Sequence, residues 1–394
     1  DKTIIIFLSD HGASLVGAYE LMLSEDKQFE KMLGFLYMFL PKNSSYNSFV
    51  EYNEQRMVTP YDIFGTFIDI LYEKEERPDF YFNGQSLLEK INGLERTCKK
   101  YNELKNYPSA ISDYGRAIEL NPNDEIVYYN RGAAYAALEN FKSAVIDYNQ
   151  AVKLNPNYAE AYYNRGSAYY ELENFYQAVA DFTKAIELNP NDSSAYYDRA
   201  MAYAELQNYE QALSDFTMAI HLNPSYINAY NNRGNVYYDL HDYHGAINDY
   251  TQAITINSDF DFAYNNRGIA FKELKNYQRA ISDFTRAIEI NSDYANAYYN
   301  RGNTYYSLQN YHTAIFDYDR AIEIDSDFAS AYGNRGIVYA VMKNYMQAMS
   351  DLNRSIKLGL VEGEIFYYRG LCYQAIGENS KAESDFKTAK QFGY

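Results

Sequence analysis

The sequence predicts an all-α superhelical solenoid of stacked helix pairs, preceded by a small and incomplete α/β segment. The first observation is a 34-residue repeat that continues without insertion from Glu125 to Tyr394. The second is that small residues recur at two fixed places in each unit, and the third is that helix-breaking residues mark the unit boundaries. Eight full units are predicted, starting at residues 125, 159, 193, 227, 261, 295, 329 and 363.

Each unit is predicted to form two helices that pack closely and that bury their apolar faces only by stacking on neighbouring units. With the first residue of a unit counted as position 1, glycine occupies position 8 in all units but one, and alanine occupies position 20 in every unit. Aromatic residues recur at positions 11 and 24, where they fill the space beside the small residues. Proline at position 32 is predicted to end the second helix at Pro122, Pro156, Pro190 and Pro224. Serine replaces proline at the next three boundaries and is predicted to cap the following helix, at Ser258, Ser292 and Ser326.

This pattern resembles the tetratricopeptide repeat (TPR) family over about three quarters of the chain. In the unit that starts at Ala159, for example, Gly166, Ala178 and Pro190 occupy positions 8, 20 and 32. The resemblance implies a right-handed superhelix with a concave groove lined by the first helix of each unit. The stretch from Tyr101 to Asp124 matches positions 11 to 34, so one partial unit precedes the eight full ones and the solenoid is predicted to span residues 98–394.

Opposite charges recur at two positions with the same period. Arginine occupies position 7 and aspartate occupies position 23 in every unit, from Arg131 and Asp147 to Arg369 and Asp385. A guanidinium group holds a carboxylate through two parallel hydrogen bonds, so this recurrence favours structural ion pairs between packed helices. The alternative is a stripe of arginines that binds anions.

Position 6 is the strongest candidate for a binding function. In TPR superhelices it faces the groove, and a row of asparagines there resembles the one that holds extended peptides in some members of the family. An amide side chain donates to a peptide carbonyl and accepts from a peptide N–H, so it binds backbone without selecting a sequence. The position-6 asparagines are Asn130, Asn164, Asn232, Asn266, Asn300 and Asn334, with Asp198 and Tyr368 as exceptions, and Asn235 and Asn303 at position 9 are predicted to extend the site.

Acidic residues on the same predicted face indicate the kind of ligand. Position 13 is acidic in four successive units, at Glu171, Glu205, Asp239 and Glu273, and the chain has a formal net charge of −18. Neutral or basic extended segments of protein partners are therefore favoured as ligands, although a simply solvated acidic surface is the alternative. Position 2 never carries lysine, which disfavours the clamp by which some TPR domains hold the C-terminal carboxylate of chaperones.

Composition excludes several other partners. The acidic balance argues against nonspecific nucleic-acid binding, and no run of 18 apolar residues is present to span a membrane. The last unit has no additional capping helix after it, so its open face is a candidate for self-association. The only cysteines, Cys98 and Cys372, lie far apart on the predicted solenoid, which fits a reducing, cytoplasmic compartment.

The segment of residues 1–97 differs in character and shows no 34-residue period. Its motifs IFLSDHG, RMVTPYDIFGTFIDIL and GQSLL, followed by ERTC, resemble the C-terminal end of an alkaline-phosphatase/sulfatase superfamily domain. That resemblance implies a metal-binding role for Asp10 and His11, because adjacent Asp and His after a core strand bind a catalytic metal in the superfamily. The nucleophile and the remaining acidic ligands of such a site are not found in this sequence, so Asp10 and His11 are predicted to be vestigial.

Two hypotheses for the function follow. The favoured one is a non-catalytic interaction scaffold without cofactors, which binds extended peptide segments in its groove. The alternative is a truncated metal-dependent phosphoric- or sulfuric-ester hydrolase that uses the repeats as a docking tail. A complete phosphatase-like domain upstream would then indicate a secretory location instead of the cytoplasm.

Overall fold

A computed structural model describes residues 106–394 of the chain. The chain divides into two compact units, one from Asp1 to Pro122 and one from Asn123 to Tyr394. In the first unit, the described residues form the helix α7 (Tyr107–Leu120), which covers the positions of a second helix in the predicted partial repeat. The predicted strands of the N-terminal segment lie outside the described residues, as does the predicted domain boundary between residues 97 and 98.

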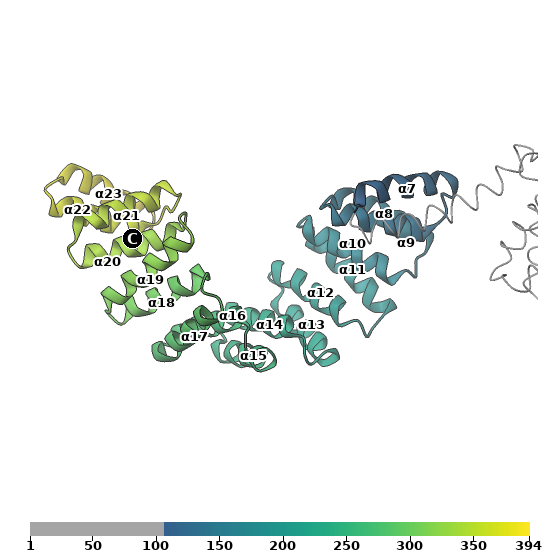
Figure 1. Ribbon diagram of the computed structural model, residues 1–394, viewed down its shortest axis with the longest axis horizontal. Helices are drawn as coiled ribbons and strands as arrows, with labels where there is room; N and C mark the ends of the chain where they lie inside the picture. Colours follow the sequence, from purple (N-terminus) through teal and green to yellow (C-terminus); the bar gives the residue numbers. More distant parts are fainter. Residues whose placement is uncertain (1–105) are drawn as a thin grey trace, which may run out of the picture. The chain divides into compact units, whose positions relative to one another are not determined.

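The unit from Asn123 to Tyr394 is an array of helix pairs, as predicted (Figure 1). The first helices of the successive repeats are α8 (Glu125–Ala137), α10 (Ala159–Glu171), α12 (Ser193–Glu205), α14 (Ile227–Asp239), α16 (Asp261–Glu273), α18 (Ala295–Ser307), α20 (Ala329–Val341) and α22 (Gly363–Ala375). The second helices are α9 (Phe141–Leu154), α11 (Phe175–Leu188), α13 (Tyr209–Leu222), α15 (Tyr243–Ile256), α17 (Tyr277–Ile290), α19 (Tyr311–Ile324), α21 (Tyr345–Lys357) and α23 (Asn379–Gln391). The two helices of a repeat pack against each other, and each second helix up to α21 also packs against the first helix of the next repeat.

Small residues let the two helices of a repeat approach closely. The alanine at position 20 is buried in every repeat, and the side chain at position 24 lies over the glycine at position 8. A Cβ added to Gly234 would lie 2.7 Å from the ring of Tyr250, and one added to Gly268 would lie 2.7 Å from the ring of Phe284. Atoms at that distance overlap, so a side chain at these glycines would force the ring at position 24 to shift.

The turn between the two helices of a repeat has the same geometry in the first seven repeats, although its sequence varies. Position 15 is left-handed and is occupied by residues other than glycine, with φ between 57° and 65°, at Glu139, Glu173, Gln207, His241, Lys275, Gln309 and Lys343. The backbone N–H groups at positions 15 and 16 donate to carbonyls of the last turn, as Glu173 does to Tyr170 and Asn174 does to Tyr169. This double bond pattern is a Schellman motif, which satisfies the carbonyls at the end of a helix.

The boundary between repeats does not use serine as predicted. The second helix ends at position 30 whether proline or serine follows at position 32. The N-cap residues of α16, α18 and α20 are Phe260, Tyr294 and Phe328, and their side chains make no capping hydrogen bond. The side chain at position 31 holds the turn instead, because Asn257 and Asn291 accept from the backbone N–H two residues later at 3.0 and 3.1 Å. The prediction of serine caps was wrong because this local asparagine turn already interrupts the helix.

Candidate functional site

The arginines at position 7 form a buried series of ion pairs, named here the Arg–Asp ladder. In each of the eight repeats the Nε and Nη2 atoms of the arginine donate to the two carboxylate oxygens of the position-23 aspartate, at 2.6–2.8 Å. The aspartate side chains are 0–9% exposed and the arginine side chains 15–22%. The ion-pair interpretation is therefore confirmed. The anion-binding alternative is disfavoured because the Nε and Nη2 donors of these arginines already bind the aspartates.

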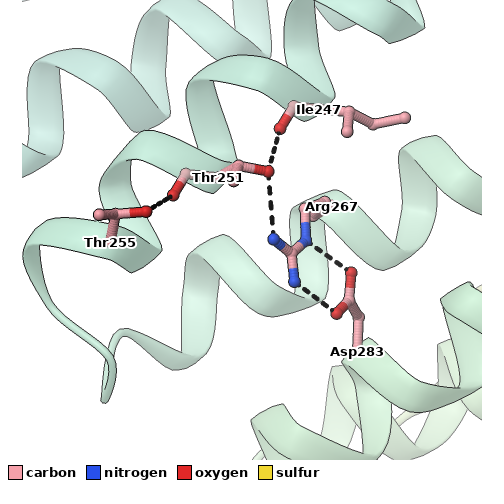
Figure 2. A network of polar contacts seen from close by, with 5 residues as sticks. All are labelled: Ile247, Thr251, Thr255, Arg267 and Asp283. Atoms are coloured by element: carbon pink, nitrogen blue, oxygen red, sulfur yellow. Dashed lines mark hydrogen bonds and ion pairs between the residues drawn. The ribbon is translucent and has the colours of Figure 1, made fainter.

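The same arginines also join one repeat to the next. Figure 2 shows that Arg267 donates from Nη1 to the Thr251 hydroxyl of the preceding second helix, while its other nitrogens hold Asp283. The Thr251 hydroxyl in turn donates to the carbonyl of Ile247. Equivalent Nη1 contacts of 2.6–3.1 Å connect every neighbouring pair of full repeats, so the ladder runs through the whole array.

The side chains at position 6 lie side by side along the first helices, and they are named here the position-6 row. Each residue of the row from repeat 2 to repeat 7 hydrogen-bonds to the position-5 side chain of the preceding repeat. The bonds join Asn164 to Tyr129 (2.8 Å), Asp198 to Tyr163 (2.5 Å), Asn232 to Tyr197 (2.7 Å), Asn266 to Asn231 (3.2 Å), Asn300 to Asn265 (3.0 Å) and Asn334 to Tyr299 (3.1 Å). Asn130, in the first full repeat, makes no side-chain hydrogen bond within the described part of the chain.

The two predicted asparagines at position 9 have inward-facing partners. Asn235 accepts from the hydroxyl of the buried Tyr250 at 2.8 Å, and Asn303 accepts from that of the buried Tyr318 at 2.7 Å. Each also accepts from the next member of the row, because Asn266 donates to Asn235 at 3.2 Å. Asn334 donates to Asn303 in the same way, at 2.8 Å. These two asparagines therefore accept hydrogen bonds both from buried tyrosine hydroxyls and from asparagines of the row.

The row leaves some hydrogen-bonding capacity open. Asn164 and Asn300 each donate one side-chain hydrogen bond from Nδ2, and within residues 106–394 their Oδ1 atoms accept none. Both side chains are only partly buried. In contrast, Oδ1 of Asn232 accepts from Asn231 and Asn235 at 3.1 and 3.3 Å. The amides that retain an open acceptor therefore lie on either side of the densely bonded middle repeats.

The four predicted acids at position 13 are all exposed: Glu171, Glu205, Asp239 and Glu273. Tyrosines lie beside them, since the Tyr170 hydroxyl donates to Glu205 at 3.5 Å. Burial, followed by the charge of Glu205, raises the pKa of Tyr170 to about 12. Burial, followed by the charge of Glu273, raises the pKa of Tyr238 to about 12. Tyr170 and Tyr238 therefore stay neutral beside these acids at neutral pH.

Sequence reasoning missed the role of position 5. Tyr129, Tyr163, Tyr197 and Tyr299, together with Asn231 and Asn265, hold the row and are as much part of this face as the row itself. The signal was present, because position 5 contains only tyrosine or asparagine in the first six full repeats. Both residue types offer an oxygen that accepts from an amide.

Asp10 and His11 lie outside the described residues, so their predicted metal-binding role stays a prediction. Among residues 106–394, no group of three or more His, Cys, Asp or Glu side chains is arranged to hold a metal ion. Among the same residues, no helix has the length and apolar character required to cross a membrane.

Comparison with known protein families identifies the same kind of repeat that the sequence pattern predicts. The family profile described as "Tetratricopeptide repeat" matches residues 159–192, 193–226, 227–260, 262–294 and 295–328, and a second one described as "TPR repeat" matches residues 99–139 and 134–173. The two profiles together cover more than half of the chain. No curated protein matches the sequence. Nothing in these matches supports the resemblance of residues 1–98 to a phosphatase or sulfatase.

Several solved structures are similar. A tetratricopeptide repeat protein from Parabacteroides merdae is 22% identical, with a TM-score of 0.50 over 60% of this chain and 93% of that one. MamA is 26% identical, with a TM-score of 0.40 over 41% of this chain and 94% of that one. YrrB, described as a TPR protein with an unusual peptide-binding site, is 23% identical, with a TM-score of 0.42 over 47% of this chain and 95% of that one.

The family is established by three concordant findings: the profile matches, the helix pairs, and the packing of position 24 on position 8. The chain therefore belongs to the tetratricopeptide repeat family, whose members commonly act as protein–protein interaction scaffolds.

Proposed function

We propose that this chain is a non-catalytic scaffold that binds extended, neutral or basic peptide segments along the face formed by the position-6 row. The observation that carries the proposal is the row itself, which presents amide side chains at intervals of one repeat. An extended peptide offers alternating N–H and C=O groups, so amides with an open acceptor are suited to bind its backbone.

Asn164 and Asn300 are the two residues that best support this proposal. Each has a side chain that is fixed on one side by a bond to the preceding repeat, to Tyr129 and Asn265 respectively. A side chain that is already held in place loses little conformational entropy when a ligand binds. The remaining carbonyl oxygen and the second amide hydrogen are then available to a peptide.

The charge of the face determines which peptides are favoured. Positions 2, 5, 6, 9, 12 and 13 of the first helices carry Glu160, Glu171, Asp198, Glu205, Asp239, Glu273 and Glu364, with Lys272 as the one basic residue. An excess of carboxylates attracts basic segments and repels acidic ones. Self-association through the last repeat stays a prediction, and nothing in the described residues adds to it.

The test is selection of peptides from a phage-displayed library of random dodecapeptides on the full chain. Retained peptides are synthesised, and their affinities are measured for the wild-type chain and for the double variant Asn164→Ala with Asn300→Ala. Because each lost hydrogen bond contributes about 1 kcal/mol, the affinity is expected to fall roughly tenfold or more.

The matched control is Asn248→Ala, which removes an exposed asparagine from the second helix α15. It is expected to leave the affinities unchanged. The proposal fails if the wild-type chain retains no peptide, or if the double variant binds the retained peptides as well as the wild type does. Circular dichroism of both variants shows that they keep the helical fold.

A further inference from the structure

Asp198 is the point at which the position-6 row changes from an amide to a carboxylate. It lies on α12 between Asn164 and Asn232, and its Oδ2 atom accepts from the Tyr163 hydroxyl at 2.5 Å. That distance is typical of a hydroxyl bonded to an ionised carboxylate. The corresponding bonds of Asn164 and Asn232 to their tyrosines measure 2.8 and 2.7 Å.

The Asp198 carboxylate has no cationic partner among the described residues. The charged group that acts on the pKa of Asp198 is another acid, Asp192. The Asp192 carboxylate caps α12 by accepting from the backbone N–H groups of Ser194 and Ala195. The side chain is only partly exposed, and burial, opposed in part by the bond from Tyr163, raises its pKa. A half-buried charge without a counter-ion costs free energy that an asparagine in the same place does not.

Tyrosines surround this carboxylate. Tyr163 donates to it, and Tyr197 precedes it on the same helix with its ring stacked on that of Tyr226 at 4.8 Å between centroids. Tyr226 lies close enough that burial, followed by the charge of Asp198, raises its pKa to about 12. Tyrosine rings attract cations through their faces, so rings and carboxylate favour the same kind of ligand group.

The repeat that contains Asp198 and the repeat before it carry acids and no bases at the positions of this face. Positions 2, 5, 6, 9, 12 and 13 of the repeats that start at residues 159 and 193 carry four acids, Glu160, Glu171, Asp198 and Glu205. Of these, Asp198 alone belongs to the position-6 row. A cation of the ligand that lies along the row therefore meets Asp198 directly.

We propose that Asp198 binds one cationic side chain, lysine or arginine, of the peptide that occupies the position-6 row. This inference rests on the proposed function and adds a point of side-chain recognition to a face that otherwise binds backbone. A lysine or arginine supplies the missing counter-ion, and its N–H groups donate to the Oδ1 atom that Tyr163 leaves open. The free-energy cost of the unpaired carboxylate is thereby offset only when a basic peptide is bound.

The experiment uses the full chain, its Asp198→Asn variant and the same dodecapeptide library. Asparagine is the residue found at this position in six other repeats and keeps an acceptor for Tyr163, so the variant is expected to fold with unchanged or higher stability. The wild type is expected to select peptides with lysine or arginine at one fixed place. Asp198→Asn is expected to lose that preference and to bind the selected peptides about tenfold more weakly, since a hydrogen bond between charged groups is lost.

A double-mutant cycle isolates the contact. Replacing the selected lysine or arginine of the peptide by glutamine is expected to weaken binding to the wild type about tenfold and binding to Asp198→Asn hardly at all. The control is Asp192→Asn, which removes an equal charge nearby and keeps a residue suited to cap α12. It is expected to preserve the preference for the basic residue.

The outcomes separate this inference from the proposed function. If the peptides depend on Asn164 and Asn300 but show the same basic preference with Asp198→Asn, the inference alone is overturned. An equal loss with Asp192→Asn also overturns it, because the effect is then one of general charge. If the wild-type chain retains no peptide, the proposed function fails and this inference fails with it.

Discussion

The Arg–Asp ladder and the position-6 row differ in how much variation they allow. Both run along the array with the same period; the ladder joins every neighbouring pair of full repeats, and the row joins repeats 1 to 7. The ladder has the same two charged residues in all eight repeats, whereas the row and its position-5 partners alternate among asparagine, tyrosine, aspartate and glycine. The contact whose carboxylates are almost fully buried is therefore invariant, whereas the contact between the partly buried position-6 side chains and position 5, which includes the buried Asn231 and Asn265, varies.

The physical reason lies in the cost of leaving a partner unpaired. The ladder aspartates are almost fully buried, so an aspartate without its arginine is a charge in a poor solvent. The row side chains are only partly buried, and water can replace a lost partner there. Variation in the row is therefore available for recognition, and variation in the ladder is not.

The largest effect is expected from breaking the ladder in the middle of the array. Arg233→Ala leaves the carboxylate of Asp249, which is 1% exposed, without its two charge-assisted hydrogen bonds. Loss of one partner of a buried pair costs about 3–5 kcal/mol, so the free energy of unfolding is expected to fall by that amount. Urea unfolding followed by circular dichroism measures it.

The control for this variant is an exposed arginine on a neighbouring second helix. Arg286 contacts Asp259 at 3.6 Å and Glu289 at 3.1 Å, and both acids are more than half exposed. Because solvent screens such pairs, Arg286→Ala is expected to leave the urea midpoint nearly unchanged. Similar losses in the two variants would contradict the proposed distinction between buried and exposed arginines.

The sequence predicted the ladder better than it predicted the row. The pairing of Arg267 with Asp283 follows from two invariant charges within one repeat, and geometry leaves few other partners for them. The bond from Asn300 to Asn265 spans 35 residues and joins two repeats, so it depends on how the repeats stack. The stacking of repeats depends on side-chain packing that the repeat length does not specify, and the partners at position 5 were therefore missed.

Local turns were predicted only in part for a related reason. Proline at position 32 was a correct sign that the helix has ended, but the end itself is fixed one residue earlier by asparagine turns such as that of Asn257. Ser258 occupies the position that proline has in other repeats, and it follows Asn257, whose side chain already forms the turn. A local hydrogen bond thus decided the structure at a place where residue preference suggested a cap.

A smaller effect is expected from removing Asn266, a row residue in the densely bonded middle repeats. Asn266 donates to Asn231 and Asn235, both at 3.2 Å, and accepts from Asn265 at 3.4 Å, so Asn266→Ala removes all three bonds. Because the site is partly open to water, the expected loss is about 1–2 kcal/mol, less than that for Arg233→Ala. Urea unfolding of the two variants side by side gives the comparison.

The expected order of these losses is itself informative. Asn300→Ala removes a single row bond, of 3.0 Å, and is expected to cost less than Asn266→Ala. A loss for Asn266→Ala as large as that for Arg233→Ala would mean that the row is a core element. Its role in recognition would then have to be reconsidered.

The smallest effect is expected at position 15, in the turn between the two helices of a repeat. The backbone conformation there is similar in every repeat, but the residue type varies. Position 15 is left-handed in seven repeats without glycine, as at Glu173 with φ 57°, whereas the eighth has Gly377 with φ 84°. The left-handed conformation costs an L-residue about 1–2 kcal/mol, while glycine loses about 0.5–1 kcal/mol more backbone entropy on folding. Glu173→Gly is therefore expected to stabilise the chain by about 0.5 kcal/mol, seen as a higher urea midpoint, and Gly377→Ala to destabilise it. If Glu173→Gly lowered the midpoint instead, the side chain at position 15 would contribute a contact that outweighs its strain, and the variable turns would belong with the row and not with the scaffold.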